Sequence, residues 1–177
     1  MYMTQLITKC DYKFDKDKII KEVLSISAEH SLYNGQLSLT HSKRTINSTT
    51  IEQLLEATRH QHQELNIFDM FNEQYKGTEL HKIFNTIPNL GKFRIVMKPP
   101  MSCYNVHKDS TKKYHFVINT NPSSFFVFPE RDEVIHIPCD GNVYLVDTLE
   151  PHTFINCGDS QRIHLVLSEF NDVPNTT

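Results

Sequence analysis

Hydrophobic residues in the first half of the chain recur at helical spacing, and near residue 85 the pattern changes to the alternation of short strands. A helix is predicted from Phe14 to about Glu29, starting at Asp15 or Asp17. Its apolar face is expected to carry Ile19, Ile20, Val23 and Leu24. Further helices are predicted after Thr49 or Thr50, at 67–71 and at 78–84, and short strands at 5–9 and 36–40.

The second half of the chain is predicted to form an antiparallel sheet. Candidate strands lie at 92–98, 114–119, 123–128, 134–138, 142–147 and 162–168, separated by turn-forming Pro, Gly, Asn and Asp residues. Short strands with turns every eight to twelve residues or so are typical of a sandwich or closed barrel. The expected fold class is therefore α+β, a β-barrel core with helices from the first half packed on one face.

Length and charge limit the function classes. The 177 residues fit one domain, with a helix-rich part at 1–88, a β core at 89–170 and a tail at 171–177. The net charge is −3 and Lys and Arg are scattered, so no nucleic-acid partner is expected. No apolar run approaches the roughly 18 residues of a membrane span, and the N-terminus lacks a signal-peptide core.

The cysteines do not indicate a metal or redox motif. The four residues are far apart and form no C-x-x-C pair: Cys10, Cys103, Cys139 and Cys157. This spacing argues against a zinc ribbon or a thioredoxin-like site. Reduced thiols in a soluble, cytoplasmic protein are expected.

His107-Lys-Asp109, followed much later by His152, is the donor set that holds non-haem Fe(II) and leaves positions open for other ligands. In an extended segment, His107 and Asp109 point to the same face, and His152 must come from a different strand. An H-x-D pair alone is weak among ten histidines, and each histidine by itself is more simply a structural residue.

Arg162 adds weight to this interpretation. One face of 162–168 carries Arg162, His164, Val166 and Ser168, whereas the other is aliphatic. If the aliphatic face packs under the helices, Arg162 points into the barrel, where an unpaired guanidinium costs roughly 3–5 kcal/mol. A carboxylate ligand would match it bidentately, and the alternatives are an internal Asp or Glu partner or an outer-edge position.

Lys113 and His115 are predicted to share a second inward face, shortly after the first two ligands. They would bring further positive charge towards the metal. The alternative is a solvated lysine beside a packed histidine.

The ordered set of motifs resembles the aspartyl/asparaginyl β-hydroxylase family of Fe(II)- and 2-oxoglutarate-dependent oxygenases. The resemblance is strongest from Leu90 to Ser168. It is carried by Phe93-Arg-Ile-Val-Met-Lys-Pro-Pro, His107-Lys-Asp109, Lys113-Tyr-His115-Phe-Val-Ile-Asn-Thr-Asn, Gly141-Asn-Val-Tyr-Leu-Val-Asp-Thr and Pro151-His152-Thr-Phe-Ile-Asn156, leading to Arg162.

The resemblance implies a double-stranded β-helix, a cupin-like jelly roll. It implies that His107, Asp109 and His152 are the iron ligands and that Arg162 clamps the distal carboxylate of 2-oxoglutarate. His115 would lie near the other carboxylate. Lys113 stands where the family usually has arginine and would hold a substrate or co-substrate carboxylate. The implied activity is hydroxylation by dioxygen of an amino-acid side chain, either free or within a peptide or protein.

Two other interpretations stay open. A cupin-like metal enzyme that does not use 2-oxoglutarate would not need Arg162 ten residues after His152. A barrel-shaped binding module without catalysis predicts no Fe(II) affinity and no 2-oxoglutarate-dependent thermal shift. Phe125, Phe126 and Phe128 could line a substrate mouth, although core packing is expected for at least two of them. His136 is expected to be structural. His60-Gln-His62 lies on a predicted polar helix face, where a solvated surface is expected rather than a zinc site.

Overall fold

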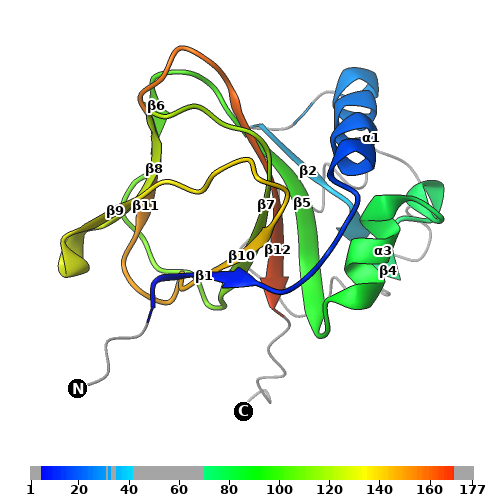
Figure 1. The fold of residues 1–177 in the computed structure, drawn as a ribbon, viewed down its shortest axis with the longest axis horizontal. Helices are drawn as coiled ribbons and strands as arrows, with labels where there is room; N and C mark the ends of the chain where they lie inside the picture. Colours follow the sequence, from blue (N-terminus) through cyan, green and yellow to red (C-terminus); the bar gives the residue numbers. More distant parts are fainter. Residues whose placement is uncertain (1–4, 31, 33–34, 42–69, 170–177) are drawn as a thin grey trace.

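Two antiparallel sheets face each other in the computed structural model of the chain, which describes residues 5–30, 32, 35–41 and 70–169 (Figure 1). The larger sheet contains, in spatial order, β1 (Ile7–Cys10), β10 (Val143–Val146), β7 (Lys113–Asn119), β12 (Arg162–Glu169), β5 (Leu90–Lys98) and β2 (Gln36–Ser38). The smaller sheet contains β6 (Ser102–Cys103), β11 (Thr153–Asn156), β8 (Ser124–Phe128) and β9 (Glu133–Ile135). A two-stranded sheet pairs β3 (Thr40–His41) with β4 (Met70–Phe71).

Helices α1 (Lys16–Glu29) and α3 (Glu79–Thr86) lie on the outer side of the larger sheet (Figure 1). Asp15 caps α1 by accepting from the N–H of Lys18 at 3.1 Å, an interaction worth about 1 kcal/mol. The Glu22 carboxylate of α1 accepts from the first two N–H groups of α3, at 2.9 and 3.1 Å. Negative charge at that helix N-terminus is stabilising, so Glu22 fixes one helix on the other.

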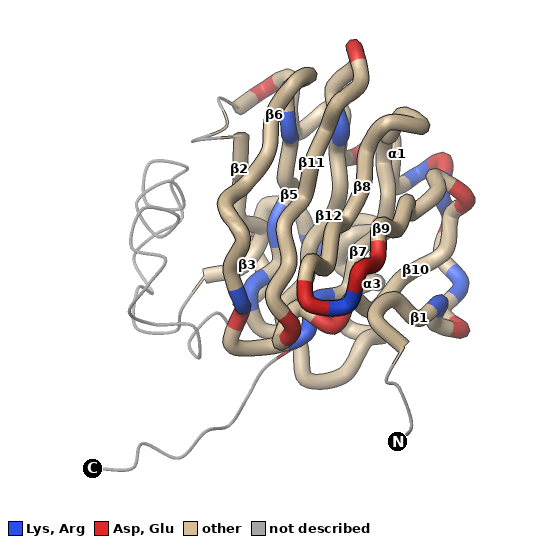
Figure 2. The backbone as a smooth tube through the Cα atoms, turned by 90° about the vertical axis from the view of Figure 1, so that its left-hand side faces the viewer, with Lys and Arg blue, Asp and Glu red and all other residues tan. Residues whose placement is uncertain are grey.

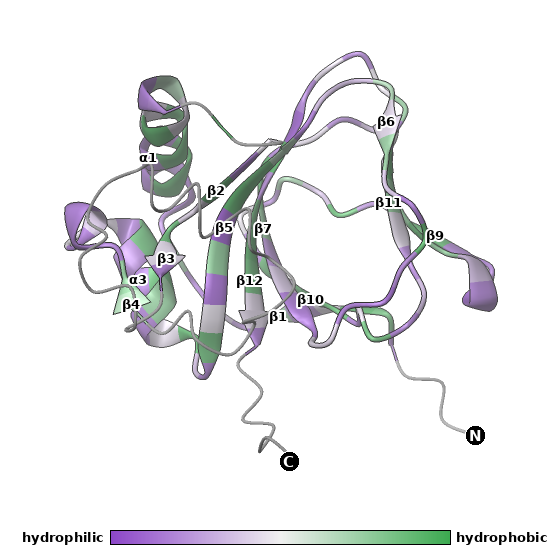
Figure 3. Ribbon diagram, turned by 180° about the vertical axis from the view of Figure 1, so that it is seen from behind, coloured by the Kyte–Doolittle hydropathy of each residue, from purple (hydrophilic) through white to green (hydrophobic). Residues whose placement is uncertain are grey.

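Apolar side chains form one core outside the larger sheet and a second core between the two sheets. In the outer core, α1 and α3 pack on alternate residues of β12 and β5 (Figure 3). This cluster includes Ile19, Val23, Ile83, Ile95, Ile163, Leu165 and Leu167. The inner cluster includes Val117, Phe126, Phe128 and Phe154. The helices therefore cover the aliphatic face of β12, as its alternation predicts.

The architecture confirms the predicted α+β double-stranded β-helix, with short helices on one face. Each of the six predicted strands of the second half has a counterpart, although β9 ends at Ile135 rather than at residue 138. Two shorter strands, β6 and β11, were not among those predicted. The helix predicted at 78–84 is α3, and Thr78 caps it by accepting from the N–H of His81 at 3.2 Å.

Some local predictions were wrong. Leu24 is 49 % exposed because the buried face of α1 continues to Ile26 instead. Met70–Phe71 forms strand β4 and not the end of a helix, and the strand predicted at 36–40 divides into β2 and β3. The helix expected after Thr49 or Thr50, the His60-Gln-His62 cluster and the tail at 171–177 lie outside the described residues.

Three further observations concern the described residues as a whole. All four cysteine thiols are free. In the described residues, no helix is both long and apolar enough to cross a membrane. In the view of Figure 2, basic and acidic residues are interspersed along the strands and turns.

Replacing Leu165 tests whether the outer core holds the helices on the sheet. Leu165 is 0 % exposed, so Leu165→Ala should lower the free energy of unfolding by about 2–5 kcal/mol, measured by urea denaturation. The control, Leu24→Ala, removes a side chain that is half in solvent and should change stability by about 0.5 kcal/mol or less. Equal effects of the two variants would contradict the packing described.

Candidate metal centre and adjoining cavity

Both histidines of the predicted metal site lie beside strands of the smaller sheet. His107 follows β6 and His152 precedes β11. The two form an isolated antiparallel bridge, in which each N–H donates to the carbonyl oxygen of the other at 2.9 Å. Asp109 is fixed nearby because its N–H donates to the carbonyl of Thr148 at 2.8 Å. Backbone hydrogen bonds thus bring residues far apart in the sequence to one place.

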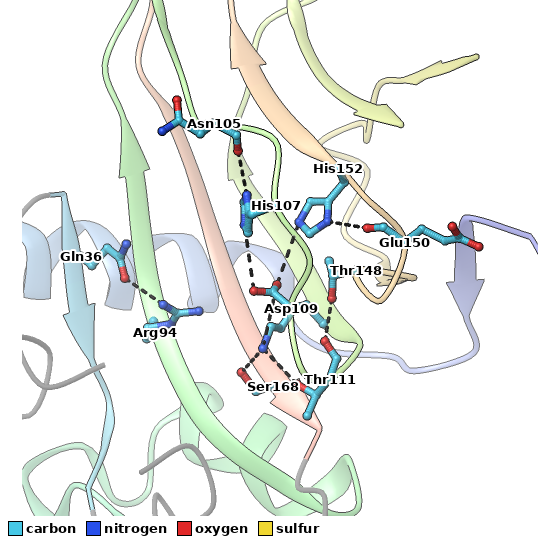
Figure 4. A network of polar contacts seen from close by, with 11 residues as sticks. Gln36, Arg94, Asn105, His107, Asp109, Thr111, Thr148, Glu150, His152 and Ser168 are labelled. Atoms are coloured by element: carbon cyan, nitrogen blue, oxygen red, sulfur yellow. Dashed lines mark hydrogen bonds and ion pairs between the residues drawn. The ribbon is translucent and has the colours of Figure 1, made fainter. Parts of the chain in front are cut away.

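The three predicted ligands converge (Figure 4), with donor atoms that all lie within 4.8 Å of one another. The Asp109 carboxylate faces both rings, with Oδ1 4.0 Å from Nε2 of His107 and Oδ2 4.0 Å from Nε2 of His152. Two imidazoles and one carboxylate grouped in this way are the facial donor set of non-haem Fe(II).

Backbone carbonyls orient both imidazoles for metal binding. Nδ1 of His107 contacts the carbonyl of Asn105 at 2.8 Å, and Nδ1 of His152 contacts the carbonyl of Glu150 at 3.0 Å. A carbonyl oxygen only accepts, so each Nδ1 carries the proton and each Nε2 presents a lone pair towards Asp109. Burial also lowers the pKa of His152, which favours its neutral, ligating form. The residues present therefore fit a divalent metal.

Lys113 is buried beside the ligand carboxylate. Its Nζ donates to Thr111 Oγ1 at 2.9 Å and to Ser168 Oγ at 3.0 Å, and lies 4.0 Å from Oδ2 of Asp109. Burial lowers its pKa to about 8, and the Asp109 charge opposes that shift. With two of its N–H groups already bonded, Lys113 is placed to orient Asp109.

Arg162 is 2 % exposed and begins β12. Its Cζ lies 3.8 Å from the centroid of the Phe154 ring, and Nη2 contacts Nδ1 of His164 at 2.5 Å. Nε has no hydrogen-bond partner, and within the described residues no carboxylate forms an ion pair with this guanidinium. Burial lowers its pKa to about 9. The sequence left open an internal Asp or Glu partner for Arg162. The described part of the chain contains no such ion pair.

A hydrogen-bond network joins Arg162 to His115 through His164. Nδ1 of His164 accepts from Arg162 and also lies 3.3 Å from Nδ1 of His115. Burial and the charge of Arg162 lower the pKa of both histidines well below the ordinary value, so both rings are neutral.

One cavity of about 240 Å³ collects all of the predicted site residues. The predicted residues that line it are His107, Asp109, Lys113, His115, His152 and Arg162. Its apolar walls include Phe126 and Phe154, which are both 4 % exposed. Phe126 therefore belongs to both the core and the cavity wall, whereas Phe128 is core alone and His136 contacts the carbonyl of Ser124.

Arg94 and Gln36 also line the cavity, and neither belongs to the predicted site. Arg94 Nη1 donates to Oε1 of Gln36 at 2.9 Å. The sequence could have indicated Arg94. Alternation along β5 puts its side chain on the other face of the strand from the buried Phe93 and Ile95. The carbonyls of Asn105 and Glu150 have no such signal, since any residue supplies a carbonyl.

Metal binding should depend on each of the three ligands. We expect His107→Ala, Asp109→Ala and His152→Ala each to weaken Mn²⁺ binding by more than about 100-fold. Replacing a residue that only orients a ligand typically weakens metal binding by about 10- to 100-fold. Isothermal titration calorimetry measures this, with circular dichroism to confirm folding. His136→Ala is the matched control and should bind like the wild type. Wild-type affinity in the His152 variant would exclude the site.

The buried ammonium of Lys113 predicts how the stability of the metal-free protein changes with pH. Its ordinary pKa of 10.5 falls to about 8 in the fold, so between these values the unfolded chain binds more protons. Raising the pH from about 8 to 10 should therefore stabilise the fold. The pKa of Lys92 is lowered from 10.5 to about 7, so this side chain acts in the same direction throughout the window.

Urea midpoints measured at intervals between pH 7 and pH 10 check this expectation. Lys113→Met should flatten the rise with pH, because a neutral side chain no longer takes up a proton on unfolding. Lys18→Met, at an exposed position, should leave the slope unchanged. An identical slope in wild type and Lys113→Met would show that the ammonium does not titrate as expected.

Comparison with known proteins places the fold. No family model and no curated protein matches the sequence. An oxidoreductase of the 2OG-Fe(II) oxygenase family from Burkholderia pseudomallei matches with a TM-score of 0.58 and 11 % identity, over 94 % of this chain and 85 % of that chain. A viral collagen prolyl hydroxylase from Paramecium bursaria Chlorella virus-1, solved as a 2OG complex, matches with a TM-score of 0.53 and 11 % identity, over 93 % of this chain and 94 % of that one. At such identities the likeness establishes the shared double-stranded β-helix fold.

Proposed function

We propose that the protein is an Fe(II)- and 2-oxoglutarate-dependent dioxygenase that hydroxylates an amino-acid side chain, either free or within a peptide or protein. Among known families, the proposal points to the aspartyl/asparaginyl β-hydroxylases. One observation carries it: a His-Asp-His donor set and a buried guanidinium without a carboxylate partner among the described residues line the same cavity. Solved structures of the same fold include a protein of the 2OG-Fe(II) oxygenase family, which is consistent with this class.

In this proposal, His107, Asp109 and His152 hold the iron through Nε2, a carboxylate oxygen and Nε2. The carbonyls that fix the two Nδ1 protons keep the rings in the ligating tautomer before the metal arrives. Lys113 holds the Asp109 carboxylate in place. When bound, the iron supplies the oxidising chemistry by which R–H, O2 and 2-oxoglutarate become R–OH, succinate and CO2.

Arg162 would bind the distal carboxylate of 2-oxoglutarate. A guanidinium buried against Phe154 gains most from a planar, doubly hydrogen-bonded anion, and its Nε–H is available for one of those bonds. His164 holds the other end of the guanidinium. His115 lines the same cavity, where the remaining carboxylate of 2-oxoglutarate would lie near it. The apolar rings of Phe126 and Phe154 form part of the wall of this space.

The direct test measures succinate formed from 2-oxoglutarate with Fe(II) and O2, over a panel of amino acids and peptides. His152→Ala should abolish turnover. Arg162→Ala should mainly raise the KM for 2-oxoglutarate, by roughly 30-fold or more, because truncating a buried charged partner typically costs about 2–5 kcal/mol. His136→Ala should retain the wild-type rate.

Two results would contradict the proposal. Full turnover by His152→Ala would exclude the assigned metal centre. A wild-type protein that binds Mn²⁺ but shows neither stabilisation by 2-oxoglutarate nor succinate formation would favour a metal-dependent barrel that does not use this co-substrate.

A further inference from the structure

The cavity beside the metal centre has an excess of positive charge. The described residues that line it include three cationic side chains and a single carboxylate: Arg94, Lys113, Arg162 and Asp109. A divalent metal and a doubly charged dicarboxylate cancel each other, so loading the site as proposed leaves the balance unchanged. Three positive charges against one negative charge leave an excess of two. In a buried site such an excess is costly unless a further anion enters.

Two of the three cations have assigned partners. Lys113 is bonded to two hydroxyl groups and lies beside Asp109. Arg162 contacts His164 and would take the distal carboxylate of 2-oxoglutarate. Among the described cations that line this cavity, Arg94 is the one to which no anion has been assigned.

Arg94 makes one hydrogen bond in the described structure, to the neutral amide oxygen of Gln36 at 2.9 Å. Its Nε–H is buried and has no hydrogen-bond partner. Figure 4 shows the guanidinium extending from β5 towards the space beside Asp109, on the other side from the Glu150 segment. A buried guanidinium N–H without a partner, on a side chain that lines a cavity, is a donor that a carboxylate or similar anion would satisfy.

The partner of Arg94 is itself held in place by the backbone. Gln36 lies opposite Val96 where β2 pairs with β5. Just before it, Gly35 has a φ of +73° and accepts from the N–H of Met97 at 2.7 Å. A Cβ at Gly35 would meet the Met97 carbonyl oxygen too closely for any other residue to fit without a shift. The pair formed by Arg94 and Gln36 is therefore a built part of the cavity wall.

We propose that Arg94, held by Gln36, binds a carboxylate of the substrate, so that the substrate class is a small carboxylic acid or the acidic end of a longer molecule. This inference rests on the proposed oxygenase function and narrows it. The cavity of about 240 Å³ falls below the roughly 300–1,000 Å³ of pockets for drug-sized ligands, and 2-oxoglutarate would occupy part of it. A free amino acid and an Asp or Glu side chain of a peptide offer the same chemistry.

Binding measurements on protein loaded with Mn²⁺ and 2-oxoglutarate test the proposal without turnover. The probes are the free L-amino acids, their C-terminal carboxamides, and Asp and Glu blocked at both ends. At least one carboxylate probe should bind, measured by calorimetry, and its carboxamide should bind roughly 10- to 100-fold more weakly. A preference for free amino acids or for the blocked acidic residues distinguishes the two sources of the carboxylate.

The variants assign the effect to one side chain. Arg94→Gln should remove the preference for acid over amide while leaving the affinity for 2-oxoglutarate within about threefold of wild type. Arg94→Lys, which keeps the charge without the planar fork, should restore part of the preference. Arg131→Gln, the same change outside the cavity, should have no effect.

Three results would overturn the inference: binding of no carboxylate probe, equal binding of acids and amides, or a large loss of 2-oxoglutarate affinity in Arg94→Gln. The last result would assign Arg94 to the co-substrate. Each differs from a failure of the proposed function, in which the wild-type protein would not bind Mn²⁺ and 2-oxoglutarate together. That failure would also remove the basis for this substrate site.

Discussion

The alternation of β12 between β5 and β7 is the constraint on which both the core and the candidate site depend. Its odd-numbered residues, such as Leu165 and Leu167, pack under the helices, whereas Arg162 and Val166 on the other face line the cavity. The same register sets Val166 opposite both Arg94 and His115. A slip of one residue would exchange aliphatic and polar faces, so the outer core holds the inner polar groups in position.

Several cationic side chains are buried on the inner face of the larger sheet. Apolar neighbours alone would not offset the free energy cost of removing these charges from water. Neighbouring hydroxyls, neutral imidazoles and aromatic faces offset part of that cost: Ser168 for Lys113, and His164 and Phe154 for Arg162. The part of the burial cost that these neighbours do not offset favours the binding of anions. The aliphatic core outside the sheet stabilises the fold enough to keep these cations buried. An anionic ligand then gains affinity because the cations that it meets are already desolvated.

Residue spacing predicted most of the fold and the members of the candidate site, because strand alternation decides which side chains point inwards. Strands β5, β7, β8, β10 and β12 and the shared inner face of Arg162 and His164 follow from this rule alone. What spacing could not show is the origin of the ligand geometry. His107 and Asp109 do not share a strand, and their convergence arises from backbone contacts to His152 and Thr148. Short strands such as β6 form only through tertiary pairing, so no local pattern marks them.

The reciprocal backbone bridge between His107 and His152 has a consequence for how this architecture tolerates change. The backbones of these two candidate ligands are joined by hydrogen bonds that use no side-chain atoms. Insertions in the exposed turns between these residues, for example around Arg131, would lengthen the path along the chain without altering this backbone pairing. Loop length can therefore change here while the two histidines stay side by side.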